Sequence, residues 1–269
     1  MSAAIAAEPA AAPLLEVRGL QKRYGAVVAL RDVNFTVRRG EVTALLGDNG
    51  AGKSTTIKAI AGVAPIDEGD ILLEGQPVSI RHPSEATALG IQTVYQDLAL
   101  CDNLGICANL YLGRELVSSP TAVGPHVLRD VDMELEARRV LKTLRINLPA
   151  LDTPVASLSG GQRQAVAIAR AVLWDSKLVI MDEPTAALGV AQTAEVLRLV
   201  RDLAEQGYGV ILITHNMQNV FQVADNIAVL RLGATVMQAR KSEVTPEQVV
   251  GAITGTLAIP GTGAAGALA

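Results

Sequence analysis

The segment that decides the fold is Val42-Thr43-Ala44-Leu45-Leu46-Gly47-Asp48-Asn49-Gly50-Ala51-Gly52-Lys53-Ser54, in which an apolar run passes directly into a glycine-rich loop. Residues 42–46 are typical of a buried strand, and residues 55–62 (TTIKAIAG) read as the start of a helix. In that context the pattern G-x-x-x-x-G-K-[ST] predicts a loop whose backbone N–H groups converge on phosphate oxygens. The pattern by itself indicates only that a nucleoside triphosphate is bound.

Each residue type in this phosphate loop, residues 47–54, has a chemical reason. The three glycines let the backbone fold tightly, and the following helix adds the positive end of its dipole. We expect Lys53 to reach the β- and γ-phosphates and the Ser54 hydroxyl to bind Mg²⁺. The expected nucleotide-binding residues here are Gly47, Asp48, Asn49, Gly50, Ala51, Gly52, Lys53, Ser54 and Thr55.

Composition excludes several classes of protein. The 269 residues have a formal net charge of −4 and are only 3% aromatic. This argues against a general nucleic-acid binder, which needs a basic face and stacking platforms. Although 49% of the residues are hydrophobic, no uncharged apolar run reaches the roughly 18 residues of a membrane span. The first residues also lack the basic start of a secretory signal.

The two cysteines, Cys101 and Cys107, are too few for a disulfide framework or a zinc site. We expect both to be small buried hydrophobic residues, and the chain to be cytosolic.

Outward from the phosphate loop, short β-branched runs alternate with helical patterns, which predicts an α/β fold with a mostly parallel sheet. The expected strands are residues 14–17, 33–37, 42–46, 71–73, 91–94, 178–181, 210–213 and 227–230. Helical patterns fill the middle of the chain, with the clearest helix over residues 130–144. We therefore expect one domain over residues 14–255, made of a core (14–96 and 176–255) and an inserted helical subdomain (97–175), with flexible tails at 1–13 and 256–269.

A pair of carboxylates follows the apolar run 178–181, namely Asp182 and Glu183. Ligands of open α/β sheets bind at the carboxyl ends of the strands. Asp182 suits the shell of Mg²⁺, and Glu183 is placed to activate an attacking water as general base. Such a pair is often solvated surface, but the phosphate loop upstream favours a functional site.

Residues 158–162 read Leu-Ser-Gly-Gly-Gln and continue as RQAVAIARAVL. Here the chain resembles the ATP-binding cassette family, whose signature is LSGGQ. A serine followed by two glycines at a helix start forms an anion-binding nest. The resemblance implies a P-loop NTPase (RecA-like) core with antiparallel β elements and an inserted helical subdomain. It also implies that Ser159, Gly160, Gly161 and Gln162 contact ATP bound by a second subunit, so that a monomer cannot complete the site.

The resemblance assigns three further residues in chain order. Tyr24, in KRYG, matches the aromatic residue that stacks on adenine, and Gln96, in TVYQD, matches the glutamine that contacts Mg²⁺ and the lytic water. His215, in ILITHN, matches the histidine that contacts the γ-phosphate and supports the general base. One position departs from the family: Gly189 stands where many members carry Asp, which puts one contact between the two ATP sites in doubt.

The segments GDNGAGKS, TVYQDLAL, YLGRE, VIMDEPTAALGV and THNMQNVFQVAD are similar to the ATP-binding subunits of bacterial monosaccharide importers. The similarity implies an ATPase that uses ATP and Mg²⁺ and works as a dimer with a second copy or a second ATPase subunit. Its implied partners are an integral-membrane sugar permease and, indirectly, an extracytoplasmic sugar-binding protein, with no nucleic acid. The implied location is the cytoplasmic face of the plasma membrane.

The permease is expected to dock in the groove near Gln96 and the segment up to about Arg114. The apolar residues 98–112 either accept a permease helix or face the core, since apolar helical stripes usually face inward. Three rival functions remain: a soluble cassette ATPase outside transport, a subunit for another substrate, and a catalytically dead regulatory subunit. Intact Lys53, Gln96, Asp182, Glu183 and His215 argue against the last.

Overall fold

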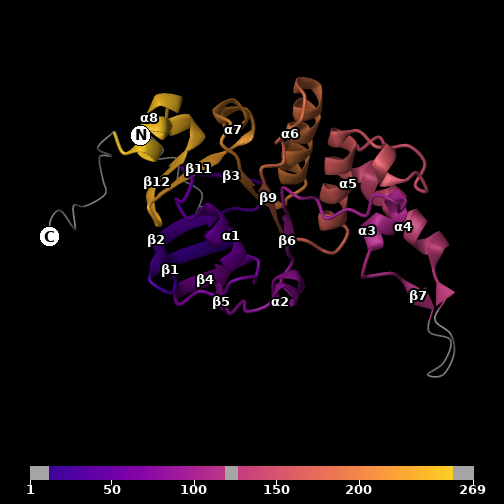
Figure 1. The fold of residues 1–269 in the computed structure, drawn as a ribbon, viewed down its shortest axis with the longest axis horizontal. Coiled ribbons are helices and arrows are strands. Elements are labelled where there is room, and N and C mark those ends of the chain that lie inside the picture. Colours follow the sequence, from indigo (N-terminus) through magenta and orange to yellow (C-terminus); the bar gives the residue numbers. More distant parts are fainter. Residues whose placement is uncertain (1–11, 119–126, 257–269) are drawn as a thin grey trace, which may run out of the picture.

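The computed structural model describes residues 12–118 and 127–256, which form a ten-stranded sheet in the order β5-β4-β1-β2-β12-β11-β3-β10-β9-β6 (Figure 1). The predicted tails lie almost wholly outside the described residues. The strands of this sheet are β1 (Leu15–Tyr24), β2 (Val27–Val37), β3 (Val42–Leu46), β4 (Glu68–Leu73), β5 (Gln76–Val78), β6 (Ile91–Val94), β9 (Leu178–Asp182), β10 (Gly209–Ile213), β11 (Asn226–Arg231) and β12 (Ala234–Arg240). A separate two-stranded sheet joins β7 (Val117–Ser118) to β8 (Val127–Leu128).

The helices surround these strands. They are α1 (Lys53–Ile60), α2 (Pro83–Ala88), α3 (Ile106–Tyr111), α4 (Asp130–Thr143), α5 (Gly160–Val172), α6 (Val190–Glu205), α7 (Met217–Val223) and α8 (Pro246–Thr254), with 3-10 turns at Val155–Ser157 and Lys241–Glu243. The predicted helix 130–144 is confirmed as α4 to within one residue.

The large sheet has a parallel part and an antiparallel part. Strands β11, β3, β10, β9 and β6 run parallel to one another, whereas β2, β1, β4 and β5 pair antiparallel. β12 pairs antiparallel with β11 and meets β2 through one residue pair, Ala234 and Asp32. The predicted α/β class and its mixed sheet are thus confirmed. Our prediction missed β5 and β12, and it found only the ends of the long β1–β2 ribbon.

Successive residues of the parallel strands enter two different hydrophobic clusters. In β10, for example, Val210 and Leu212 pack with α5 and α6, while Ile211 packs in the cluster that includes Ile57 and Ile60 of α1. All five residues of β3 and of β10 are buried, as expected for parallel strands covered on both faces. Much of the hydrophobic content therefore lies inside the fold. Among residues 12–118 and 127–256, none of the helices has the length and hydrophobicity of a membrane span.

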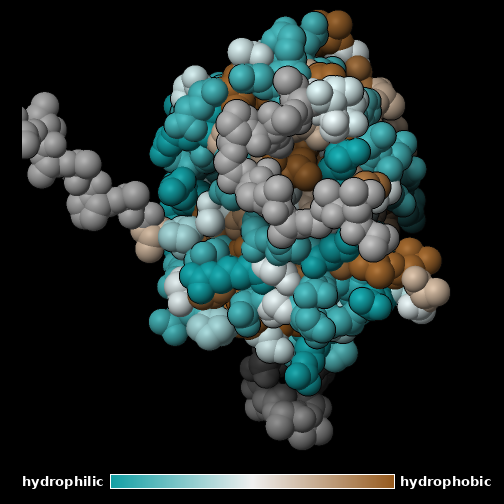
Figure 2. All heavy atoms as spheres, turned by 90° about the vertical axis from the view of Figure 1, so that its left-hand side faces the viewer, coloured by the Kyte–Doolittle hydropathy of each residue, from teal (hydrophilic) through white to brown (hydrophobic). Residues whose placement is uncertain are grey.

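On the face around α8 and β12, hydrophilic side chains predominate and hydrophobic atoms form separate small groups (Figure 2). Elsewhere, Cys101 and Cys107 are both free thiols and half-buried rather than fully buried, so our expectation of two buried cysteines is corrected.

Between β6 and β9 the chain forms α3, α4 and α5, which lie together at one end of the molecule (Figure 1). We expected no strand in this stretch, and the β7–β8 pair corrects that expectation. Of the apolar residues 98–112, Ile106, Leu110 and Tyr111 are at most 2% exposed, whereas Leu112 is 41% exposed. The core-facing interpretation therefore holds for these three residues of α3, and Leu112, directly after the helix, is the large apolar residue of the segment that is left exposed.

Candidate functional site

The chemical residues gather where parallel strands end side by side. In the register of the sheet, Leu45 of β3 lies beside Ile213 of β10, and Ile213 lies beside Asp182 of β9. On the far side of β9, Val94 of β6 pairs with Met181. Because these strands are parallel, the loops that follow them emerge at one edge of the sheet. Those loops carry the phosphate loop, the two carboxylates, His215 and Gln96.

The glycines of the phosphate loop are required by backbone conformation and by space. Gly47, Gly50 and Gly52 have φ of 150°, 79° and 105°, a region that favours glycine. A Cβ at Gly47 would lie 2.3 Å from the carbonyl oxygen of Leu230, and a Cβ at Gly52 would lie 2.7 Å from Leu30. The loop is thus pressed against β2 and the end of β11, with its backbone fixed in a tight turn.

The helix that follows this loop presents a positive end. No side chain caps α1, and no acidic residue lies in its first turn, so its first N–H groups remain without helical partners. The Lys53 ammonium donates to the carbonyl oxygens of Gly47 at 2.7 Å and Asp48 at 3.0 Å, and Ser54 is exposed beside it. A lysine, exposed N–H groups and a hydroxyl in one place suit a polyphosphate bound with a divalent cation.

Glu183 and His215 face each other across the ends of β9 and β10. The Glu183 Oε1 lies 2.9 Å from the His215 Nδ1. Glu183 adopts the left-handed conformation, with φ of 48°, which is costly for a non-glycine residue unless its surroundings hold it. The backbone N–H of Glu183 donates to the Ile213 carbonyl at 2.9 Å. Thr185, two residues after Glu183, accepts at its Oγ1 a hydrogen bond from the side-chain amide of Asn219 at 3.0 Å. The catalytic candidate is therefore held at its backbone as well as at its side chain.

Asp182 is half-buried directly before this pair. Burial, and then the neighbouring Glu183, raise the pKa of the Asp182 carboxyl above its usual value, while Lys53 and Lys58 oppose the shift. The nearby lysines do not fully offset burial and the charge of Glu183, so the Asp182 carboxylate is suited to bind a cation. Within residues 12–118 and 127–256, no group of three His, Cys, Asp or Glu side chains could hold a metal by itself. The donors present, Ser54, Asp182 and Gln96, fit Mg²⁺, which takes few protein ligands together with phosphates and water.

Two residues that the resemblance singles out lie at exposed positions. Gln96 is exposed two residues after β6 ends. Tyr24 ends β1 with 47% of its surface exposed, and the ammonium of Lys22 lies 5.6 Å from the centre of its ring. An exposed ring at a strand end leaves a face accessible for stacking.

The signature loop, residues 158–162, closes a helix cap. Ser159 is the N-cap of α5, and its Oγ accepts a hydrogen bond from the Gln162 N–H at 3.3 Å. In return, the Gln162 Oε1 accepts from the Ser159 N–H at 3.0 Å. The Gln162 side chain, which we expected to contact ATP, is thus engaged in the cap. The Ser159 hydroxyl proton and the N–H groups of Gly160 and Gly161 remain to meet an anion.

The loop that follows Glu183 packs against the same signature loop. A Cβ at Gly160 would lie 2.8 Å from Leu188, and one at Gly161 would lie 3.2 Å from Gln192. Gly189, where Asp is common in the family, is the N-cap of α6, and its N–H donates to the Gln192 Oε1 at 3.4 Å. Our sequence analysis missed Gln192, although a Gln three residues after an N-cap is a recognisable capping-box signal.

The structure does not bring the two anion-binding loops of one chain together. Among the described residues, no hydrogen bond joins residues 47–55 to residues 159–162. The helices that these loops precede, α1 and α5, lie in different parts of the molecule (Figure 1). Within one chain, the phosphate loop and the signature loop thus lie apart from each other.

The chain is similar to known proteins over most of its length. The sequence profile of the ABC transporter family matches residues 30–186. A xylose/arabinose import ATP-binding protein of Sulfolobus acidocaldarius is 45% identical over 90% of this chain and 94% of its own length. A fructose import ATP-binding protein of Rhizobium meliloti is 47% identical over the same shares of the two chains. A ribose import ATP-binding protein of Caldanaerobacter subterraneus is 37% identical, but the match covers only 47% of it.

Solved structures show the same fold. A nucleotide-free ATP-binding cassette from an ABC transporter has a TM-score of 0.76 at 26% identity, covering 90% of this chain and 96% of that one. An ABC transporter cassette in its ADP conformation gives a TM-score of 0.75 at 26% identity, covering 90% and 95% of the two chains.

Proposed function

The chain belongs to the ATP-binding subunits of the ABC transporter family, which are ATPases, and from that premise we propose that it powers the import of a monosaccharide through a partner permease. The relatives that match over nearly their whole length are named for the import of xylose, arabinose and fructose. Nothing in the chain contacts a sugar in this proposal, because the permease and a binding protein outside the membrane select it. The working location is then the cytoplasmic face of the plasma membrane.

The observation that carries the ATPase proposal is the Glu183–His215 pair next to the phosphate loop. Glu183 is 18% exposed at its side chain and accepts a contact from a histidine that is 83% exposed. This leaves the imidazole on the outer side, where it can meet the γ-phosphate, and the carboxylate beside it as general base for the attacking water. Lys53 and the N-terminus of α1 hold the phosphates in line.

The contribution expected of Mg²⁺ is electrostatic. Bound Mg²⁺ neutralises charge that develops on the β- and γ-phosphates. The chain's own part is to hold Mg²⁺ with the Ser54 hydroxyl and the Asp182 carboxylate, and to orient the attacking water with Gln96. Because burial disfavours the charged form of Asp182, a cation there also relieves an electrostatic cost of the folded chain.

A second subunit completes the site in this proposal. The phosphate loop and the signature loop lie in different parts of one chain, so two chains placed head to tail bring each phosphate loop to the other's Ser159. Each ATP is then sandwiched between two chains, and hydrolysis lets them separate. The exposed Ser159 hydroxyl and the free N–H groups of α5 are the donors that the partner's γ-phosphate meets.

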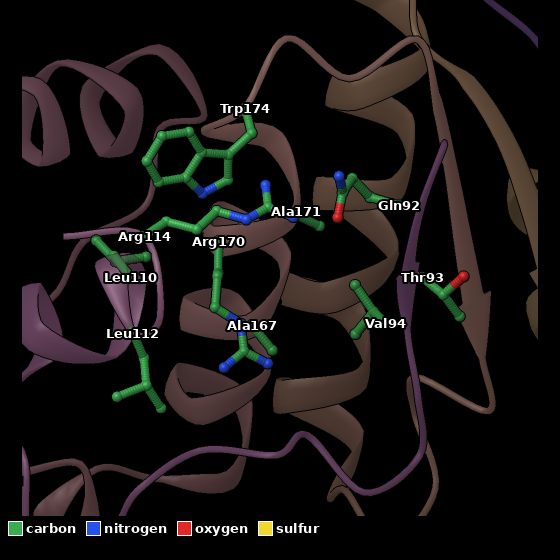
Figure 3. A pocket seen from close by; sticks show the side chains of 10 residues that line it. All are labelled: Gln92, Thr93, Val94, Leu110, Leu112, Arg114, Ala167, Arg170, Ala171 and Trp174. Carbon is green, nitrogen blue, oxygen red and sulfur yellow. The ribbon is translucent and has the colours of Figure 1, made fainter. Parts of the chain in front are cut away.

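The permease docks beside α5 in this proposal. A hollow opens between β6 and the helices, with Gln92 and Val94 on one side and Leu112, Arg114 and Trp174 on the other (Figure 3). Leu112 is the exposed end of the apolar segment that we expected at this surface. The guanidinium of Arg114 lies 5.3 Å from the centre of the Trp174 ring, which fixes a cation at the rim.

Reconstitution with the permease tests the proposed function. The purified chain, its permease and the binding protein are placed in proteoliposomes, and uptake of single radiolabelled monosaccharides is measured with Mg·ATP on the chain's side. We expect one monosaccharide to accumulate and to stimulate ATP hydrolysis. The Lys53→Ala chain should lose both, and the Lys142→Ala chain, changed at an exposed lysine of α4, should keep both. ATP hydrolysis without uptake of any monosaccharide would favour another substrate or a cassette ATPase outside transport.

A further inference from the structure

We propose that Arg170 is a positioning residue that carries movement at the permease groove to Gln96. The proposal rests on the proposed function, because it needs an ATPase that is coupled to a permease. It assigns to the second half of α5 a task distinct from that of the signature loop at its start.

Arg170 forms hydrogen bonds with the backbone of the loop that follows Gln96. Its Nη1 donates to the Ala99 carbonyl at 2.8 Å, and its Nη2 donates to the Leu98 carbonyl at 2.7 Å. Ala99 holds a left-handed conformation, with φ of 49°, which is strained for a residue with a side chain unless the surroundings fix it. The planar fork of an arginine suits two neighbouring oxygens, whereas a lysine offers one ammonium for both.

No carboxylate explains this arginine. Among the residues that the structure describes, none lies within ion-pair distance of Arg170. Arg170 is half-buried, and burial lowers the pKa of its guanidinium. Because this half-buried cation donates to two backbone carbonyls and pairs with no carboxylate, its role is to hold the backbone of Leu98 and Ala99 in place rather than to balance a charge.

The remainder of the same loop is attached to the helices too. Arg163, two turns before Arg170 on α5, pairs with Asp102 at 2.6 Å. The fully buried Asn109 of α3 accepts from the Cys101 N–H at 2.7 Å and donates to the carbonyls of Cys101, Leu104 and Gly105. Residues 98–105 are therefore one body with α3 and α5.

Only a short segment links this body to the sheet at that point. β6 ends at Val94, and Arg170 takes hold of the chain at Leu98. The three residues between them, Tyr95, Gln96 and Asp97, are all exposed. When the helices shift relative to the sheet, the displacement at this junction has to be absorbed by those three residues, and Gln96 is the middle one.

The same arginine also borders the groove. Arg170, Ala167 and Ala171 of α5 line the hollow together with Leu112 and Trp174 (Figure 3). A permease segment seated there presses on the side chain that holds Leu98 and Ala99. Arg170 lies 11 residues after Ser159 on helix α5, about three turns away. Because both the signature loop and the loop after Gln96 are attached to this helix, the two loops move together with it.

The test measures coupling rather than activity alone. Arg170→Met and Arg170→Lys chains are assembled with the permease in proteoliposomes, and sugar taken up is divided by ATP hydrolysed. This coupling ratio should fall on the order of three- to tenfold for Met and less for Lys. In a Gln96→Ala chain, adding Arg170→Met should lower the ratio no further, because both changes act at one point.

Arg201→Met is the matched control. Arg201 of α6 is also half-buried and also donates to a backbone carbonyl, that of Val223, at 3.1 Å, but it pairs with Asp225 at 2.8 Å and does not line the groove. Its removal should lower the amount of folded protein without changing the coupling ratio.

Two results overturn the proposal. One is an Arg170→Met chain whose uptake and hydrolysis fall in proportion, so that the coupling ratio stays that of the wild type. The other is a further fall of the ratio when Arg170→Met is added to Gln96→Ala. Failure of the proposed function looks different, because the wild-type chain itself then shows no sugar-stimulated hydrolysis of Mg·ATP.

Discussion

The Glu183 Oε1 and the His215 Nδ1 lie 2.9 Å apart at the ends of two paired parallel strands. The two residues are 32 positions apart in the chain, and the register of β9 with β10 brings them together by placing Asp182 beside Ile213. The carboxylate is mostly shielded while the imidazole is mostly exposed. In the proposed mechanism, this difference in exposure places the general base on the inner side and the histidine that orients it on the outer side.

Replacing Glu183 with Gln should separate binding from hydrolysis. The amide keeps the size of the side chain but cannot take a proton from water, so kcat should fall at least about 100-fold. The affinity for ATP should stay within about threefold, because Lys53 and the phosphate loop are unchanged. Phosphate release and ATP binding measured on the same preparation check this. Near-normal turnover would remove Glu183 as the general base.

Replacing His215 with Ala should lower kcat with little effect on KM. The loss should vanish in a Glu183→Gln background, because residues that act as one unit are not additive. His82→Ala is the matched control: this histidine is the N-cap of α2, and ATP turnover should be unaffected. Equal and independent losses from the two site changes would show that the pair does not act as a unit.

Asp182→Asn should stabilise the isolated chain at neutral pH. The raised pKa means that the folded chain binds a proton at this carboxyl more tightly than the unfolded chain does. The stability cost of Asp182 is therefore absent below the ordinary pKa of an aspartate and grows as pH rises through the raised pKa. The Asn chain should melt higher than the wild type at pH 7, with a gap that narrows toward pH 4. A gap that is constant with pH, or of opposite sign, would contradict this origin.

Gly189→Asp tests whether the departure from the family matters for this chain. Gly189 has φ of −71°, and a Cβ there would meet nothing within 4 Å. An Asp at this N-cap can accept from the first turn of α6, so the free energy of unfolding should rise by a few tenths of a kcal/mol. ATP turnover should be retained, because Gln192 already closes the cap. Chemical denaturation and phosphate release measure the two quantities, and a fall in stability would contradict the geometry.

The strands that could be predicted are those whose own residues form a recognisable apolar run. Strands β3, β9 and β10 are short, mostly apolar runs, and polar or glycine residues stand at or just after their carboxyl ends, so both their class and their chemistry can be read locally. β12 was missed because it is partly exposed and carries polar residues such as Gln238 and Arg240. The β1–β2 ribbon was underestimated because its register shifts at three places, which breaks the alternation that indicates a strand.

The candidate site also contains residues that local sequence predicts and residues that it does not. The phosphate loop and the carboxylate pair follow from residue types and spacing, and Tyr24, Gln96 and His215 followed only from resemblance. The hydrogen bond of Arg170 to Leu98 spans 72 positions, and the one between Asn219 and Thr185 spans 34. Contacts of this kind depend on how helices pack on the sheet, and no local pattern carries them.

Whether two chains complete each ATP site is decided by the mass of the Glu183→Gln chain in solution. Light scattering during gel filtration is recorded with and without Mg·ATP, and again with Ser159→Arg added, which blocks the anion-binding loop but leaves the phosphate loop intact. We expect the 28.1 kDa monomer without nucleotide, twice that mass with Mg·ATP, and a monomer under both conditions once Ser159 is replaced. A chain that binds Mg·ATP and remains monomeric, or one that still dimerises with Arg at position 159, would contradict it.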